Sequence, residues 1–157
     1  MADPFTQALY DRLVDIIPLK PGEQRPHVYT YPAPVPPEGE NPDSRMLWVV
    51  PCIVVSGPAL NIPEDTKTTR GRIHERHIVC YTEDHGSTAD VDAIAEEVRR
   101  RLHITGADLL DPNGNRPLTV AGYEVIIQTV HGPVVAPTDT RRYGRALIVT
   151  MHAQEAA

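Results

Sequence analysis

Residues 76–103, RHIVCYTEDHGSTADVDAIAEEVRRRLH, decide the fold, because they combine an apolar strand, a short turn and one amphipathic helix. Apolar side chains in the helical part recur with the i, i+3, i+4, i+7 spacing that places them on one face. Ser87, with Asp90 three residues later, matches an S-x-x-D capping box and predicts the helix start. Such a helix needs a sheet to cover its apolar face. The apolar positions are Val91, Ile94, Ala95, Val98 and Leu102.

The opposite face of this helix carries charges in a favourable order. Glu96 precedes Arg100 and Glu97 precedes Arg101 by four residues each, with the acid on the N-terminal side. Arg99 joins these arginines in the last turns, where positive charge suits the helix dipole. These features predict a stable helix on the surface and do not indicate a catalytic or ligand-binding site.

Composition places the chain among ordinary globular domains. It has 157 residues, 41% hydrophobic and 23% charged, with a net charge of −6. We expect a single domain over residues 1–157, with a core made mostly of aliphatic side chains. The acidic balance argues against nucleic-acid binding, which needs positive surface. No apolar run approaches the length of a membrane span, and no signal peptide is evident, so we expect a soluble chain made in the cytoplasm.

The first 45 residues divide into a helix and an arm. Residues 3–17 are expected to form an amphipathic helix, with Asp3 as N-cap and Pro4 at the first helical position. Residues 18–45 are rich in proline and are expected to form an extended arm, interrupted by a short edge strand over residues 27–31.

Four longer segments are expected to be strands: residues 46–56, 73–82, 123–130 and 146–151. Pro51 cannot donate to a ladder, so the first of them is expected to be at an edge or bulged there. Two long polar loops, residues 57–72 and 131–143, are expected to join adjacent strands. Strands in pairs separated by single helices predict an α+β fold: a mainly antiparallel mixed sheet with two principal helices packed on it, long hairpin loops and a Pro-rich arm.

The residues that could carry chemistry do not form a catalytic or metal-binding pattern. His74 and His77 are three apart in an expected strand, so they point to opposite faces, unlike the two ligands of an H-E-x-x-H helix. Cys80 lies within the same strand without a nucleophile elbow, and we expect Cys52 and Cys80 to be buried thiols. A disulfide between neighbouring strands remains open at this point. We expect no enzymatic activity, no metal and no cofactor.

A group of basic and aromatic residues falls in or beside the two long loops. Arginine and tyrosine are enriched at the energetic centres of protein interfaces. These residues are therefore candidate protein contacts on an acidic partner, against the alternative that they are solvated loop charges. They are Arg70, Arg72, Arg141, Arg142 and Tyr143.

The layout of these segments resembles the siphophage tail-terminator proteins, minor tail or tail completion proteins of lambda-like phages. The resemblance rests on an A-L-Y-x-x-L helix at residues 8–13, on R-x-x-V-C-Y at residues 76–81 and on A-x-x-V-R-x-x-L at residues 95–102. Residues 141–143, Arg-Arg-Tyr before a final strand, are similar to the end of that family. The likeness covers most of the chain.

The resemblance implies a structural virion protein at the head-proximal end of the tail. It implies a homo-hexameric ring that caps the tail tube, ends tube polymerisation and meets the head–tail connector or stopper protein. DNA would only pass through the channel, and no membrane is involved. The alternative is another neck protein, a head completion or stopper protein. More distant alternatives are a small hydrolase or metal enzyme using His74, His77 or Cys80, and an adaptor that binds through residues 32–37.

Overall fold

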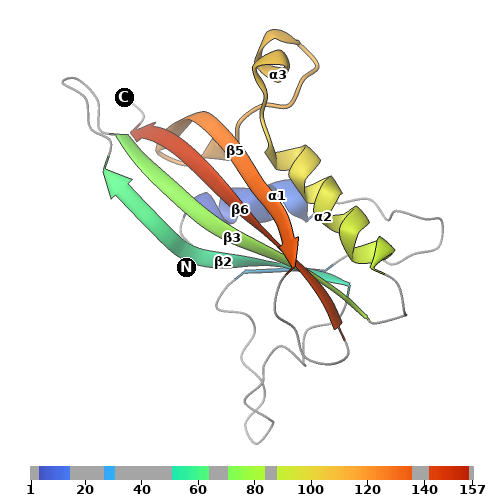
Figure 1. The fold of residues 1–157 in the computed structure, drawn as a ribbon. Helices are drawn as coiled ribbons and strands as arrows, with labels where there is room; N and C mark the ends of the chain where they lie inside the picture. The colour runs from blue at the N-terminus through green and yellow to red at the C-terminus, as the bar shows by residue number, and fades with distance from the viewer. Residues whose placement is uncertain are drawn as a thin grey trace, which may run out of the picture.

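A computed structural model describes residues 4–14, 27–30, 51–63, 71–83, 88–135 and 142–155. Its described part is built around one curved sheet of six strands in the order β1-β2-β3-β6-β5-β4 (Figure 1). None of the described helices is long and apolar enough to span a membrane. The elements are α1 Pro4–Leu13, β1 His27–Thr30, β2 Cys52–Pro63, β3 Gly71–Glu83, α2 Ala89–Leu102, α3 Gly106–Leu110, β4 Thr119–Val120, β5 Tyr123–Val135 and β6 Arg142–Glu155.

Strand pairing confirms the predicted fold class. The strands β2, β3, β6, β5 and β4 pair antiparallel, and β1 adds a parallel edge to β2. The sheet is therefore mixed and mainly antiparallel, with α1 and α2 as its principal helices. The predicted edge strand at residues 27–31 is β1.

Both principal helices pack on the same face of the sheet. The five predicted apolar positions of α2, from Val91 to Leu102, are all buried. Phe5, Leu9 and Leu13 line the buried side of α1. On the sheet, alternate residues of the two central strands meet these helices, among them Ile78, Leu147, Val149 and Met151. Burial of this mostly aliphatic core supplies most of the favourable free energy of folding.

Several predicted boundaries are wrong. The loop predicted over residues 57–72 is largely strand, because β2 continues to Pro63 and β3 begins at Gly71. The pairing of β2 with β3 accommodates Pro58 by a shift in register on each side of that residue. The loop predicted over residues 131–143 is shortened in the same way by β5 and β6.

The helix ends also differ from the prediction. The N-cap of α2 is Thr88 and makes no side-chain capping hydrogen bond, so the expected capping box does not form there. The first helix ends at Leu13 rather than residue 17, and Val14 is exposed. The strand predicted from residue 46 begins at Cys52, directly after Pro51. Residues 46–50 lie outside the described residues, as do Asp3, Ser87 and the Pro-rich arm apart from β1.

Gln128 of β5 connects three elements from inside the core. Its side chain is 1% exposed, and its Nε2 donates to the carbonyl of Leu102, at the end of α2, at 2.6 Å. Its Oε1 accepts from the amide of Leu118 at 2.9 Å, and its own carbonyl accepts from Ile104. A buried helix end needs partners of this kind for its last carbonyls. The segment that carries α3 therefore has both of its ends attached to one side chain.

Candidate protein interface

The structure separates two of the predicted contact residues, Arg72 and Tyr143. Arg72, which is exposed, lies at the start of β3 and pairs with Ala153, whereas Tyr143 pairs with Thr82 at the other end of the same strand. At about 3.3 Å per residue this separates them by roughly 30 Å. Tyr143 is half-buried against the core. Arg70 and Arg141 lie outside the described residues, and the side chain of Arg142 is not described. Their role in protein contacts stays a prediction.

The two histidines of the predicted strand point to opposite faces, as expected. His74 is buried on the helix side and stacks on Phe5 with ring centroids 3.8 Å apart. His77 is exposed on the other side. Within the described ranges no group of three or more His, Cys, Asp or Glu side chains could hold a metal ion.

Neither cysteine forms a disulfide, and the two are buried on opposite faces of the sheet. Cys80 belongs to the main core, and Cys52 to a smaller cluster with Val54 and Tyr81. The disulfide that the sequence left open is therefore absent. Burial, together with the nearby Cys52, raises the pKa of the Cys80 thiol well above its usual range.

We expect Cys80 to resist alkylation in the native protein. The thiolate is the nucleophile, and a raised pKa keeps the native thiol neutral even when the pH passes the usual thiol range. Iodoacetamide labelling followed by mass spectrometry of the Cys80 peptide should show little modification at pH 8 to 9 and complete modification in guanidinium chloride. Rapid native labelling would contradict the buried placement.

The central part of the sheet face opposite the helices is uncovered by any described helix and carries one charged side chain. Alternation along three paired strands places four rows of side chains on it. We call this surface the open face. Its rows are Val79, Ala146 and Val134; His77, Ile148 and His131; Glu75, Thr150 and Thr129; and Ile73, His152 and Ile127.

The open face is poor in charged residues. Glu75 is its single acid, and it has no lysine or arginine, although 23% of the chain is charged. Ile127 and Val134 are 50% and 60% exposed. Depletion of charge at the centre of a surface patch distinguishes protein interfaces from ordinary solvent-facing surface.

A second exposed apolar surface is the tip of α3. Residues 105–116 project beyond the end of the sheet, with α3 at the tip (Figure 1); we call them the α3 projection. Leu109 and Leu110 are 52% and 88% exposed there. The sequence reading predicted only a turn in this segment.

The α3 projection is held rigidly by its own polar groups. Thr105 and Asp108 form a complete capping box: the Asp108 amide donates to Thr105 Oγ1, and the Thr105 amide donates to the Asp108 carboxylate. These bonds lower the pKa of Asp108 from its usual value. Arg116 donates to the carbonyls of Asp108 and Asp111 and so closes the base of the turn. The tip leucines are thus displayed in a fixed geometry.

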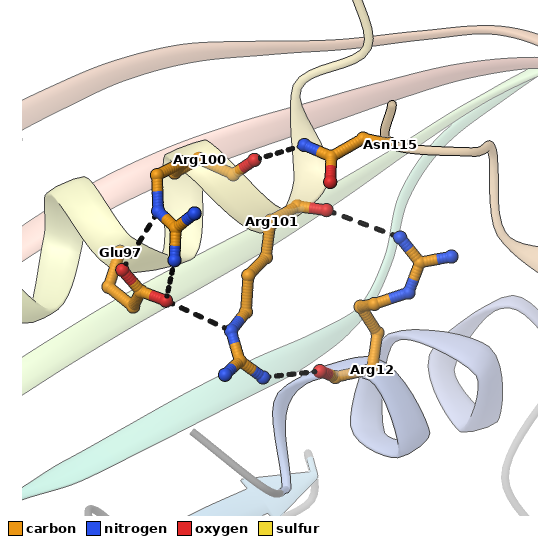
Figure 2. Close-up of polar contacts among 5 residues, drawn as sticks. All are labelled: Arg12, Glu97, Arg100, Arg101 and Asn115. Carbon is orange, nitrogen blue, oxygen red and sulfur yellow. Dashed lines mark hydrogen bonds and ion pairs between the residues drawn. The ribbon is translucent and has the colours of Figure 1, made fainter. Parts of the chain in front are cut away.

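A clamp of arginines joins the base of the α3 projection to the helices (Figure 2). Arg12 of α1 donates to the carbonyls of Arg101 and Arg116 at 3.2 and 3.1 Å. In return Arg101 donates to the carbonyl of Arg12 and to Glu97. Glu97 also binds Arg100, whose hydrogen bond is the main cause of the lowered pKa of Glu97.

Neither the arginine clamp nor the hydrogen bonds of Gln128 at the two ends of the α3 segment were predicted. Of the two ion pairs expected on α2, Glu97–Arg101 forms, whereas Glu96 lies within 4.0 Å of Arg99 instead of pairing with Arg100. The T-x-x-D pattern at residues 105–108 was the signal that could have revealed α3.

We expect Arg12→Met to lower the free energy of unfolding by about 1.5 kcal/mol, because a charged donor serves several main-chain acceptors there. Arg99→Met is the matched control. Arg99 is half-exposed and its pair with Glu96 spans 4.0 Å, so its loss should change stability by less than about 0.5 kcal/mol. Urea unfolding followed by circular dichroism measures the free energy of unfolding of both variants. An equal loss in the two would contradict a stabilising role of the arginine clamp.

Comparison with known proteins finds a match in fold among solved structures. The fold is similar over almost its whole length to a chain in a solved structure described as the virion of a native gene transfer agent (GTA) particle. The match covers 96% of this chain and 95% of that chain, with a TM-score of 0.65 and 17% sequence identity. At this identity the comparison shows a shared fold. No protein-family model matches the sequence, and no curated protein matches it.

Proposed function

We propose that the chain is a structural virion protein that forms a ring on the tail tube of a phage-like particle. In this proposal the ring ends polymerisation of the tail tube protein and joins the tail to the head–tail connector or stopper protein. The observation that carries it is the end-to-end match in fold to a chain of a virion particle. The sequence resemblance to tail terminators supports the specific place in the particle.

Two features of the surface support an assembly role. The open face lacks the charge of a solvent-facing sheet, and the α3 projection displays two leucines on a rigid base. Both are suited to binding protein. The net charge of −6 also suits a ring whose channel DNA must traverse without being held.

The proposal includes a purely structural role without catalysis, metal or cofactor. The residues that an enzyme would use are His74, His77 and Cys80. We expect Cys80→Ala to leave particle yield and infectivity or DNA transfer unchanged, since Cys80 is a buried thiol on the helix side of the sheet, away from the open face. Loss of transfer with normal particle morphology would revive the catalytic alternative.

The position in the particle is tested by labelling. An epitope tag on the C-terminal end of the chain, detected with gold-conjugated antibody on purified particles, should mark the junction of head and tail. Label along the tube, at the distal tip or on the capsid surface would contradict the proposal. A neck protein of the head completion or stopper type would label the same junction. Tail length in particles made without the chain distinguishes the two roles, because only loss of a terminator leaves tail length uncontrolled.

A further inference from the structure

An asparagine followed by a glycine lies in the turn that closes the α3 projection. Asn113 is exposed, and it is the one asparagine of the chain whose next residue is glycine. Asparagine is a chemically labile residue, because the main-chain nitrogen of the next residue can attack its side-chain Cγ. Gly114 has no Cβ to block that approach. The pair therefore has the chemistry for spontaneous deamidation in water.

The folded turn holds the attacking nitrogen in a hydrogen bond. The Gly114 amide donates to the carbonyl of Asp111 at 3.0 Å, and the Asn113 amide donates to Asp111 Oδ1 at 2.9 Å. The Gly114 nitrogen can attack only after solvent base has removed its proton, and a hydrogen-bonded amide becomes accessible to base through local opening. Deamidation of Asn113 therefore needs the same opening of the turn as hydrogen exchange of the Gly114 amide.

The closed turn has no space for a longer main chain. A Cβ on Gly114 would lie 2.7 Å from Cα of Asp108, so the two main-chain segments are in close contact. The residue after Gly114 is also fixed, because Asn115 Nδ2 donates to the carbonyl of Arg100 at 2.6 Å. An additional main-chain atom between Asn113 and Gly114 would have to displace one of these two contacts.

We propose that Asn113 is a site of spontaneous deamidation, that the closed turn suppresses the reaction, and that its isoaspartyl product holds the α3 projection open. The deprotonated nitrogen of Gly114 bonds to Cγ of Asn113, the Cγ–Nδ2 bond breaks, and ammonia leaves. The product is a succinimide ring. This modification does not depend on the proposed function.

Water opens the succinimide in two ways. Cleavage of the bond between the Gly114 nitrogen and Cγ gives aspartate, and the length of the main chain is unchanged. Cleavage of the bond between that nitrogen and the main-chain carbonyl carbon of residue 113 gives isoaspartate, whose main chain is longer by one methylene group. Both products add one negative charge, so only the isoaspartyl product conflicts with the close contact between Gly114 and Asp108.

The first part of the test compares rates in the full chain. Mass spectrometry of the peptide that contains residues 113–115 measures deamidation at mildly alkaline pH, and NMR measures hydrogen exchange of the Gly114 amide. Deamidation in the native protein should be slower than in the urea-unfolded chain by the factor that protects this amide from exchange. Asn115 is the internal control, because the next residue has a Cβ, and it should keep its amide.

Arg116→Met should accelerate both reactions. It removes two charged hydrogen bonds, to the carbonyls of Asp108 and Asp111, that close the base of the turn. Their loss should raise deamidation of Asn113 and exchange of the Gly114 amide by the same factor, about 5 to 30. Arg99→Met makes the same chemical change on α2 and should change neither rate. If Arg116→Met does not fold, Thr105→Ala, which removes the capping hydroxyl, is scored by the same criteria.

The second part of the test examines the product. Ion exchange separates chains with the additional charge, and methylation by an isoaspartyl methyltransferase identifies isoaspartate. Asn113→Asp is the matched control, since it carries the same charge on a main chain of normal length. The Asp108 amide, which donates to Thr105 Oγ1 at 3.1 Å, should exchange rapidly in the isoaspartyl protein and slowly in Asn113→Asp.

Three results would overturn the proposal. One is a native deamidation rate equal to that of the unfolded chain, and another is an Arg116→Met rate equal to that of wild type. The third is an isoaspartyl protein whose Asp108 amide exchanges as slowly as in the unmodified chain.

Discussion

Replacing Gln128 with alanine is expected to lower the free energy of unfolding by about 4 kcal/mol. The side chain is buried, and its two hydrogen bonds satisfy the carbonyl of Leu102 and the amide of Leu118. Removing it leaves both main-chain groups without their partner inside the protein, at about 1 to 3 kcal/mol each, and also creates a cavity. A typical domain is stable by only about 5 to 15 kcal/mol.

Urea unfolding measures this loss, and two further variants assign its cause. Gln128→Met fills most of the volume but cannot form hydrogen bonds to the two main-chain groups. It should therefore recover only the part of the lost stability that comes from the cavity. Gln154→Ala, at the half-buried end of β6, should cost less than about 1 kcal/mol. A Gln128→Met protein as stable as wild type would contradict the anchoring role.

Replacing Gly114 with alanine is expected to disrupt the α3 projection, at a cost of about 3 kcal/mol. An added Cβ would lie 2.7 Å from Cα of Asp108 and 2.9 Å from its carbonyl carbon, which are main-chain atoms held by the capping box. They cannot move aside without opening that box.

Gly106 provides the control within the same segment. A Cβ there meets nothing within 4 Å, and the residue is the first of a helix, so Gly106→Ala should be neutral or slightly stabilising. Hydrogen exchange at the Asp108 amide measures the local effect, because that amide donates to Thr105 Oγ1 at 3.1 Å. Equal exchange rates of the Asp108 amide in the two variants would contradict the close approach of Gly114 to the main chain of Asp108.

The sequence was most informative where structure depends on neighbours along the chain. The buried face of α2 follows from a spacing of three and four residues, and the opposite faces of His74 and His77 follow from the alternation of a strand. The α+β class followed from the order of these segments. Each of these inferences needs only local geometry.

The errors arose where distant residues decide the outcome. Residues 57–63 contain a glycine and two prolines typical of a loop, yet pairing with β3 makes them a strand. Gln128 is one polar residue in an apolar strand, and its partners Leu102 and Leu118 are 26 and 10 residues away. The predicted arginine contacts were grouped by residue type, whereas the sheet separates Arg72 from Tyr143. The open face required the register of three strands.

The most direct test of the central claim is the length of tails in particles made without this chain. The gene is disrupted in the element that encodes it, and tails are measured by negative-stain electron microscopy, with the wild-type gene restored as control. The terminator role predicts tails of uncontrolled length that are not attached to heads, and a normal length distribution on restoration. Tails of normal length beside unjoined heads would indicate a neck protein instead, and intact functional particles would contradict both.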